Sequence, residues 1–259
     1  MQTLTRPWGE MHICVQGPVD GAAVVFANSL GTDLRLWDAL LPLLPPDLRL
    51  IRYDKRGHGL SDLGGAASLS DLADDAIALI EATTTAPVIF VGLSIGGLIA
   101  QNVAARRPDL IRALVLSNTA AKLGTAESWQ ARIEAVRTQG LHGLADAVME
   151  RWFGPAFRAT PAVTPWRNML IRTPADGYSA ACNALATADQ TAATAGLRLP
   201  TLVIAGAQDG ASPPDVVQAT AALISGAAFH IIEGAGHLPC VETPDAYAAV
   251  VSPFLKAHS

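Results

Sequence analysis

Cysteine is scarce in this chain of 259 residues, and its scarcity excludes two kinds of stabilisation. The three cysteines, Cys14, Cys182 and Cys240, are odd in number and far apart, and the chain has no CxxC pair. Neither a disulfide framework nor a zinc site is therefore expected, and no residue is assigned to a metal. This cysteine usage fits a reducing, cytoplasmic compartment.

Runs of Lys or Arg are also lacking, and the formal net charge is −5. Neither nucleic acid nor an anionic membrane is therefore expected as a partner. The first 15 residues lack the unbroken apolar core of a signal peptide. One uncharged stretch, residues 87–105, is long enough to cross a bilayer, but Pro87 opens it and polar residues interrupt it. A buried strand followed by a buried helix is the favoured interpretation.

Apolar residues are abundant, at 50% of the chain, which is enough for one large α/β domain with a full core. Short runs rich in Val, Ile and Leu predict buried parallel strands, because most of them do not alternate with polar residues. These runs are residues 24–27, 48–53, 88–93, 113–117, 201–205 and 229–232. Helical patterns lie between several of them, and the clearest follows Ser68, which forms a capping-box pattern with Asp71. This alternation predicts a doubly wound, mostly parallel α/β sheet.

The alternation stops between residues 120 and 196, where only helical patterns occur, for example over residues 141–153. A helical insertion between two strands predicts a cap over the carboxyl edge of the sheet. We therefore expect an α/β core formed by residues 1–119 and 197–259, and a helical cap formed by residues 120–196.

Ser94 lies between glycines in the sequence GLSIG, residues 92–96. A predicted strand precedes it and an apolar helical pattern follows it, up to about Arg106. This context predicts a tight strand-to-helix turn that exposes a nucleophilic serine. The flanking glycines are required because side chains would clash in so tight a turn. At the start of the helix, the partial positive charge favours a developing oxyanion.

A serine hydroxyl needs a general base to act as a nucleophile, and the base follows the serine in this architecture. Among the downstream histidines, His142 falls in the predicted cap, His230 in a strand and His258 at the C-terminus. His237 follows the last predicted strand on a glycine-rich loop, so it is the predicted base.

The base needs an orienting carboxylate, which should follow an earlier strand. Asp209 comes shortly after the strand predicted over residues 201–205, at the edge where side chains converge. Asp215 is the alternative, but it follows Pro213 and Pro214 and is typical of an early helix residue.

The oxyanion formed during acyl transfer requires two backbone donors. The predicted donors are the N–H groups of Ile95 and of Leu30, which lies on the loop after an early strand. Asn28 and Ser29 are expected to hold this loop through side-chain hydrogen bonds. His58 precedes Ser94 in the chain, so its glycine-rich segment is interpreted as a structural turn.

With these residues in view, the chain resembles the α/β-hydrolase fold over nearly its whole length, and more narrowly the 3-oxoadipate enol-lactonases. The Asn-Ser pair at 28–29 is the most discriminating feature, because many relatives of the wider fold carry His-Gly there. The matching segments are FANSLGTD at 26–33, YDKRGHGLS at 53–61, GLSIGG at 92–97, GAGH at 234–237 and, in the cap, ERWF at 150–153.

The resemblance implies a serine hydrolase that opens 3-oxoadipate enol-lactone to 3-oxoadipate, a cytoplasmic step in aromatic-compound catabolism. It also implies that no metal or organic cofactor is used. In the implied mechanism, Ser94 attacks the lactone carbonyl while His237 accepts its proton. A small anionic lactone is therefore the expected partner.

The predicted cap is the basic part of the chain, with eight basic and six acidic residues between 120 and 199. A cationic cap suits an anionic substrate. Trp129 and Arg132 are three residues apart and are neighbours on one helical face, so they are candidates for binding the lactone ring and its carboxylate. Arg151 and Trp152 are the alternative pair, although adjacent helical residues point in different directions.

Three other interpretations remain open at this point. A general carboxylesterase or a C–C bond hydrolase would use the same triad. A non-catalytic binding protein on a hydrolase scaffold is disfavoured by the complete set of Ser94, Asp209 and His237. A halide-lyase is disfavoured because it would carry a carboxylate nucleophile in place of Ser94.

Overall fold

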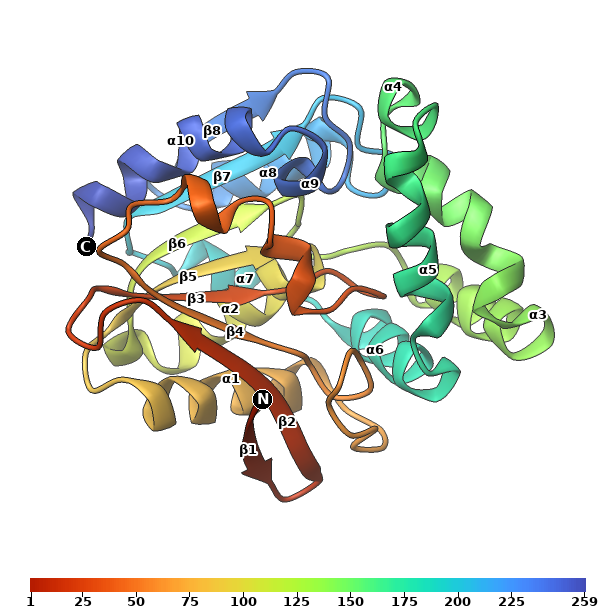
Figure 1. The fold of residues 1–259 in the computed structure, drawn as a ribbon, viewed down its shortest axis with the longest axis horizontal. Helices are drawn as coiled ribbons and strands as arrows, with labels where there is room; N and C mark the ends of the chain where they lie inside the picture. Colours follow the sequence, from red (N-terminus) through yellow and green to blue (C-terminus); the bar gives the residue numbers. More distant parts are fainter.

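A sheet of eight strands runs through the centre of the protein (Figure 1). The computed structural model describes residues 1–259, and the strand order is β1-β2-β4-β3-β5-β6-β7-β8. The strands are β1 Gln2–Arg6, β2 Gly9–Gln16, β3 Ala23–Ala27, β4 Arg49–Tyr53, β5 Val88–Leu93, β6 Ile111–Ser117, β7 Thr201–Gly206 and β8 Ala228–Ile232. β2 pairs antiparallel with β1 and with β4, and all other neighbours are parallel. The predicted mostly parallel α/β sheet is confirmed.

All six predicted strands are present, and their ends lie within two residues of the prediction. The hairpin of β1 and β2 was not predicted from the sequence. Most side chains of these two strands are exposed or half-buried, so they lack the continuous apolar run that reveals a fully buried strand.

Helices cover both faces of the sheet (Figure 1). On one face, α2 packs on the central strands and on its neighbour α1, and α7 (Thr191–Ala195) joins α2 to α8. On the other face, α10 and α9 pack against the short 3-10 helices η2 and η1. The bounds are η1 Leu34–Trp37, η2 Leu41–Leu43, α1 Leu69–Thr83, α2 Ile95–Arg106, η3 Pro108–Leu110, α8 Pro214–Leu223, α9 Pro239–Glu242 and α10 Pro244–Ala257.

The helix α1 begins with the predicted capping box. The Ser68 hydroxyl accepts a hydrogen bond from Asp71 N at 3.2 Å, and Asp71 Oδ2 accepts one from Ser68 N at 2.8 Å. Two of the backbone donors left free at the helix start are thus satisfied.

A helical insertion separates β6 from β7 and lies beyond the carboxyl ends of the parallel strands (Figure 1). Its helices beyond the sheet edge are α3 Ala126–Trp152, α4 Pro155–Arg158, η4 Pro161–Val163, α5 Thr164–Arg172 and α6 Ala175–Thr187, after which α7 returns to the face of the sheet. The predicted helix over residues 141–153 is the second half of α3, which is kinked at Gly140, where φ is 66°. The helical cap is therefore present, while its limits at residues 120 and 196 stay a prediction.

The uncharged stretch at residues 87–105 forms β5 and most of α2, as expected. None of the helices is both long enough and apolar enough to span a bilayer.

The capping box provides a test of the fold at an exposed position. Ser68→Ala is expected to lower the free energy of unfolding by about 1 kcal/mol, because the N–H of Asp71 loses its acceptor. Urea titration of the two proteins measures the difference. Ser70→Ala, two residues further along α1, is the control and should change stability by less than about 0.5 kcal/mol. Equal stability of Ser68→Ala and wild type would contradict the assigned cap.

Candidate active site

Ser94 occupies the turn between β5 and α2, in a backbone conformation that is rare for a residue with a side chain. Its φ is 58° and its ψ is −119°. A Cβ atom at Gly92 would overlap the carbonyl oxygen of Gly96, and one at Gly96 would overlap that of Ala27. The glycines are therefore required by close backbone contacts, as the sequence predicted, and the turn holds Ser94 at the start of α2.

His237 and Asp209 form a buried pair on the loops that follow β8 and β7. His237 Nδ1 lies 2.8 Å from Asp209 Oδ2, and both residues are less than 5% exposed. If Nδ1 carries the proton donated to Asp209, then Nε2 is free to accept one from a nucleophile.

Asp209 is held by further donors that the sequence analysis did not identify. Its Oδ2 accepts hydrogen bonds from Asn118 Nδ2 at 2.9 Å and from the Ser212 hydroxyl at 2.6 Å. Asn118 follows β6 with a φ of 47°, which is rare for a residue with a side chain, and nothing in the sequence marks this position. Burial favours a raised pKa for Asp209, but the His237 ring and these hydrogen bonds outweigh it and hold that pKa below its usual value.

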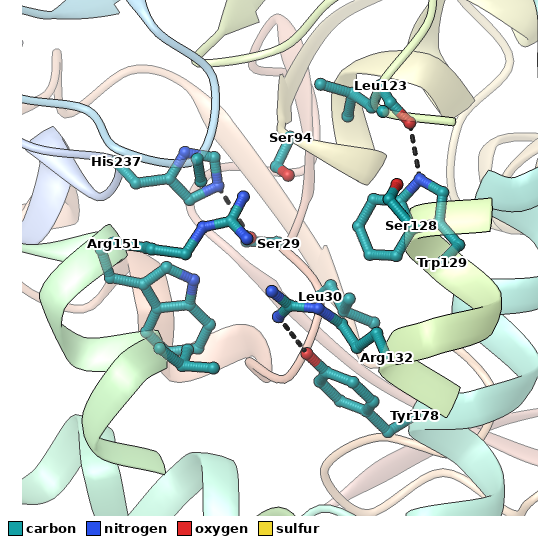
Figure 2. A pocket seen from close by; sticks show the side chains of 14 residues that line it. Ser29, Leu30, Ser94, Leu123, Ser128, Trp129, Arg132, Arg151, Tyr178 and His237 are labelled. Atoms are coloured by element: carbon teal, nitrogen blue, oxygen red, sulfur yellow. Dashed lines mark hydrogen bonds between the residues drawn. The ribbon is translucent and has the colours of Figure 1, made fainter. Parts of the chain in front are cut away.

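Ser94 and His237 line the same cavity, which has a volume of about 170 Å³ (Figure 2). A hydrogen bond between Ser94 Oγ and His237 Nε2 is not formed in this structure, and Nε2 lies 3.4 Å from Ser29 Oγ instead. Catalytic hydrogen bonds are often long in unliganded enzymes and shorten when substrate binds. The geometry is therefore that of a serine and a base that share one cavity but are not yet in contact.

The other candidate residues lie where the sequence placed them. His142 is in α3, His230 is exposed in β8, and His258 follows α10. Asp215 is an exposed residue in the first turn of α8. None of the four lines the cavity of Ser94.

The loop after β3 contains the predicted oxyanion donor Leu30, which lines the cavity. Neither Leu30 N–H nor Ile95 N–H has a hydrogen-bond partner within the protein, so both are free to bind a ligand oxygen. Asn28 holds this loop as predicted, with Nδ2 donating to Tyr53 O and Oδ1 accepting from Trp37 Nε1, both at 2.8 Å. The expectation for the Ser29 side chain was wrong, because its hydroxyl faces His237 rather than the loop.

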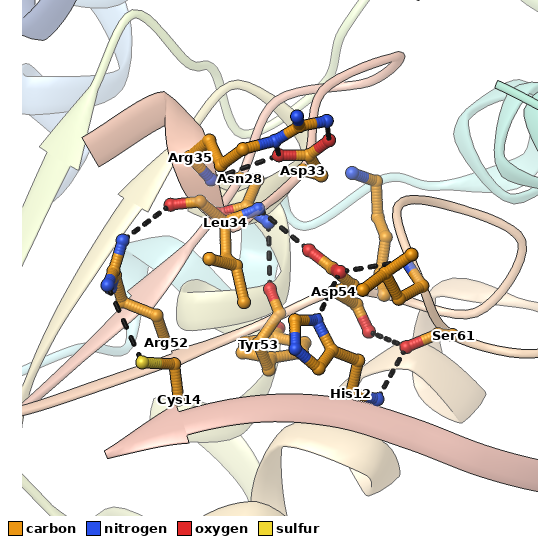
Figure 3. A network of polar contacts seen from close by, with 12 residues as sticks. His12, Cys14, Asn28, Asp33, Leu34, Arg35, Arg52, Tyr53, Asp54 and Ser61 are labelled. Carbon is orange, nitrogen blue, oxygen red and sulfur yellow. Dashed lines mark hydrogen bonds and ion pairs between the residues drawn. The ribbon is translucent and has the colours of Figure 1, made fainter. Parts of the chain in front are cut away.

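The glycine-rich segment after β4 supports the same loop, and its contacts do not require a catalytic role for His58. His58 Nε2 accepts a hydrogen bond from Gly31 N at 3.1 Å. Asp54 Oδ1 accepts one from Leu34 N at 2.7 Å, and the same carboxylate contacts His12 (Figure 3). The structural interpretation of His58 therefore agrees with its contacts.

The end of α3 is tied to both loops that carry the histidine–aspartate pair. Trp152 O accepts a hydrogen bond from His237 N at 2.7 Å, and Arg151 O accepts one from Gly210 N at 3.2 Å. Glu242, which the sequence analysis missed, bridges Gly154 N and Gly236 N at 2.9 and 3.1 Å. The cap thus fixes the position of the His237 loop.

The predicted pair in the cap, Trp129 and Arg132, and the alternative pair, Arg151 and Trp152, all line the cavity. The Arg132 guanidinium lies 5.8 Å from the centre of the Trp129 ring, which confirms that the two are neighbours on α3. Arg151 and Trp152 also line the cavity, although they are adjacent on the helix.

The two arginines have no carboxylate partner. The Arg132 guanidinium donates only to Tyr178 Oη, at 3.2 Å, and Arg151 forms no ion pair. Partial burial and the nearby Arg132 lower the pKa of Arg151 from its usual value. Figure 2 shows both guanidinium groups directed into the cavity, that of Arg151 on the side of His237 and that of Arg132 beside Tyr178. Such a pair of like charges favours the binding of an anion between them.

Comparison with known proteins agrees with this geometry. The model of the alpha/beta hydrolase family matches residues 24–250. The 3-oxoadipate enol-lactonase 2 of Acinetobacter baylyi is 35% identical, over 98% of this chain and 96% of its own length. The solved enol-lactonase from Burkholderia xenovorans LB400 has a TM-score of 0.94 at 35% identity, over 98% of this chain and 100% of that chain. A hydrolase from Pseudomonas aeruginosa PA01 has a TM-score of 0.93 at 36% identity, over 98% and 97%.

A serine in a strand-to-helix turn, followed along the chain by an aspartate and a histidine on later loops of a parallel sheet, defines a class of hydrolases. This chain belongs to the alpha/beta hydrolase family. Its resemblance to the 3-oxoadipate enol-lactonases, inferred from the sequence motifs, is confirmed by these relatives.

The two candidate carboxylates can be separated by matched substitutions. Asp209→Asn is expected to lower kcat for p-nitrophenyl acetate by about 10⁴-fold, because the amide favours the wrong tautomer of His237. Asp215→Asn is the control and should leave kcat nearly unchanged, since Asp215 is exposed on α8. The reverse order of damage would show that the orienting carboxylate is Asp215.

Proposed function

We propose that this protein is a cytoplasmic serine hydrolase that opens 3-oxoadipate enol-lactone to 3-oxoadipate. One observation carries the proposal: Ser94 and His237, which is paired with Asp209, share a cavity with two guanidinium groups that have no carboxylate partner. The first three residues supply acyl-transfer chemistry, and the two arginines select an anionic substrate. The names and the identity of the enol-lactonases described above support the same substrate.

The reaction follows from the positions of these groups. Ser94 Oγ attacks the lactone carbonyl while His237 accepts its proton through Nε2, and Asp209 stabilises the resulting imidazolium. The N–H groups of Leu30 and Ile95 stabilise the oxyanion. The tetrahedral intermediate then collapses with cleavage of the ring C–O bond, and the enolate oxygen, which needs less protonation than an alkoxide, takes the proton from the His237 imidazolium. The resulting enol stays attached to the acyl group on Ser94. Water activated by His237 then hydrolyses the acyl-enzyme, and the released enol tautomerises to the ketone.

The substrate carboxylate is assigned to the arginine pair. Arg132 and Arg151 come from opposite halves of α3, so the kink at Gly140 brings them to the same cavity. The indole rings of Trp129 and Trp152 form apolar walls beside them. A general carboxylesterase or a C–C bond hydrolase is the alternative, and it would gain nothing from two cations without partners.

Substitution of the nucleophile tests the proposal. Ser94→Ala is expected to abolish turnover of the enol-lactone, with a loss of about 10⁶-fold in kcat, because no acyl-enzyme forms. The ultraviolet absorbance of the lactone measures its loss. His237→Ala should cause a loss of similar size. Wild-type activity in a folded Ser94→Ala protein would end the proposal.

Loss of either arginine is expected to weaken binding of the anionic lactone but not of a neutral ester. Arg132→Ala or Arg151→Ala is expected to raise KM for the lactone by about 10- to 100-fold, the value of a charge-assisted hydrogen bond, and to leave p-nitrophenyl acetate hydrolysis nearly unchanged. Arg137→Ala is the matched control, because its guanidinium pairs with Glu134 on the exposed face of the same helix. Equal losses on both substrates would indicate damaged cap packing, and no loss would remove the arginine from the site.

A further inference from the structure

Lys55 is a buried cation beneath the loop that carries Leu30. Lys55 follows Asp54 just beyond the end of β4, and the residue is 3% exposed. Its ammonium group donates hydrogen bonds to Ser29 O at 2.6 Å and to Thr32 O at 3.3 Å. It forms no ion pair, and it does not line the cavity of Ser94. The reaction described above leaves this group without a role.

The contact with Ser29 O has a consequence for Leu30, because the carbonyl of Ser29 and the N–H of Leu30 belong to one peptide unit. Resonance links the two ends of a peptide group, so a cation at the oxygen makes the N–H a stronger donor. The hydroxyl and the N–H of Thr32 also donate to Ser29 O, at 2.9 and 3.3 Å. Three groups on one side of this peptide thus fix its orientation, and one of them is charged.

We propose that Lys55 is a positioning residue that orients and polarises the Ser29–Leu30 peptide, and so strengthens the Leu30 N–H as an oxyanion donor. This inference rests on the proposed function for the role of Leu30, but it does not depend on which ester or lactone is hydrolysed. Lys55 acts through the peptide and does not touch the substrate.

The charged and titratable groups around Lys55 lie on the loop after β3 and on the segment after β4. Asp54 and Asp33 favour its charged form, but each is already paired, with His12 and with Arg35 respectively. His58 accepts a hydrogen bond from Gly31 N at Nε2, and burial and Lys55 hold its pKa well below the usual value, so it is neutral. Burial lowers the pKa of Lys55 to about 7, against the smaller opposing effects of the two aspartates.

The direction of the pH effect follows from this pKa. The ammonium is present below about pH 7 and is lost as pH rises through that value. Its contribution to oxyanion binding is therefore present on the acid side and disappears on the alkaline side. The general base gives the opposite trend, because His237 must be neutral to accept a proton.

Two variants separate charge from hydrogen bonding. Lys55→Met removes both, and Lys55→Gln keeps a donor without the charge. The measurements are kcat and KM between pH 5.5 and 9, on p-nitrophenyl acetate and on the enol-lactone. Lys55→Met is expected to lower kcat about tenfold on both substrates below pH 7, less than the 10²- to 10³-fold loss on deleting a direct donor. KM should change little, and the fall in kcat above pH 7 should disappear in both variants.

A purely structural role predicts a different pattern and would overturn the inference: KM rises with the fall in kcat, and the alkaline limb of the pH profile is retained. An unchanged kcat in Lys55→Met would overturn it as well. If the lactone is not hydrolysed but the ester is, the proposed substrate fails, while the ester measurements still decide the role of Lys55.

Nuclear magnetic resonance of the wild-type protein gives a second test that needs no folded variant. The Leu30 amide resonance is expected to shift with pH, with the same midpoint near pH 7 as the Lys55 side-chain nitrogen. A Leu30 resonance that is constant while Lys55 titrates would overturn the inference, as would a Lys55 that stays charged up to pH 9.

Discussion

The close approach of two backbone segments at the end of β5 is the constraint on which the site depends. Only a residue without a side chain fits at Gly92 and Gly96, because the carbonyl groups of Gly96 and Ala27 occupy the space. The tight turn forces Ser94 to a positive φ and presents its hydroxyl at the start of α2. Since Gly96 packs on the last residue of β3, the same contact places the serine beside the loop that carries Leu30.

The other parts of the site are tied to this turn by hydrogen bonds from separate elements. The Leu30 loop is held from below by residues after β4, including Asp54, Lys55 and His58. The His237 loop is held from the cap side, through Trp152 O and the carboxylate of Glu242. Each catalytic group therefore has its own support, and the cavity between them is enclosed by α3. Charge is also distributed unevenly around this cavity, because Asp209 is held by hydrogen-bond donors while the two arginines of α3 have no carboxylate partner.

Much of this arrangement was predictable because it rests on local patterns. Buried parallel strands show as apolar runs, and the Ser94 turn shows as a glycine pattern between a strand and a helix. Asp209 and His237 could be predicted because each lies on a loop that follows a predicted strand. Asn118 and Glu242 could not, because they act through contacts with residues distant in the chain, and the sequence around them carries no pattern that marks these contacts. The β1–β2 hairpin was missed since its exposed faces are polar.

The central claim is that Ser94 becomes covalently acylated, and trapping the acyl-enzyme tests it most directly. Purified protein is mixed with the enol-lactone, quenched with acid within the first turnovers and digested for mass spectrometry. Attack on a lactone releases no leaving fragment, so the account predicts that the peptide containing Ser94 gains the full mass of the substrate. Continued turnover with no adduct, or with an adduct on a different residue, would contradict it.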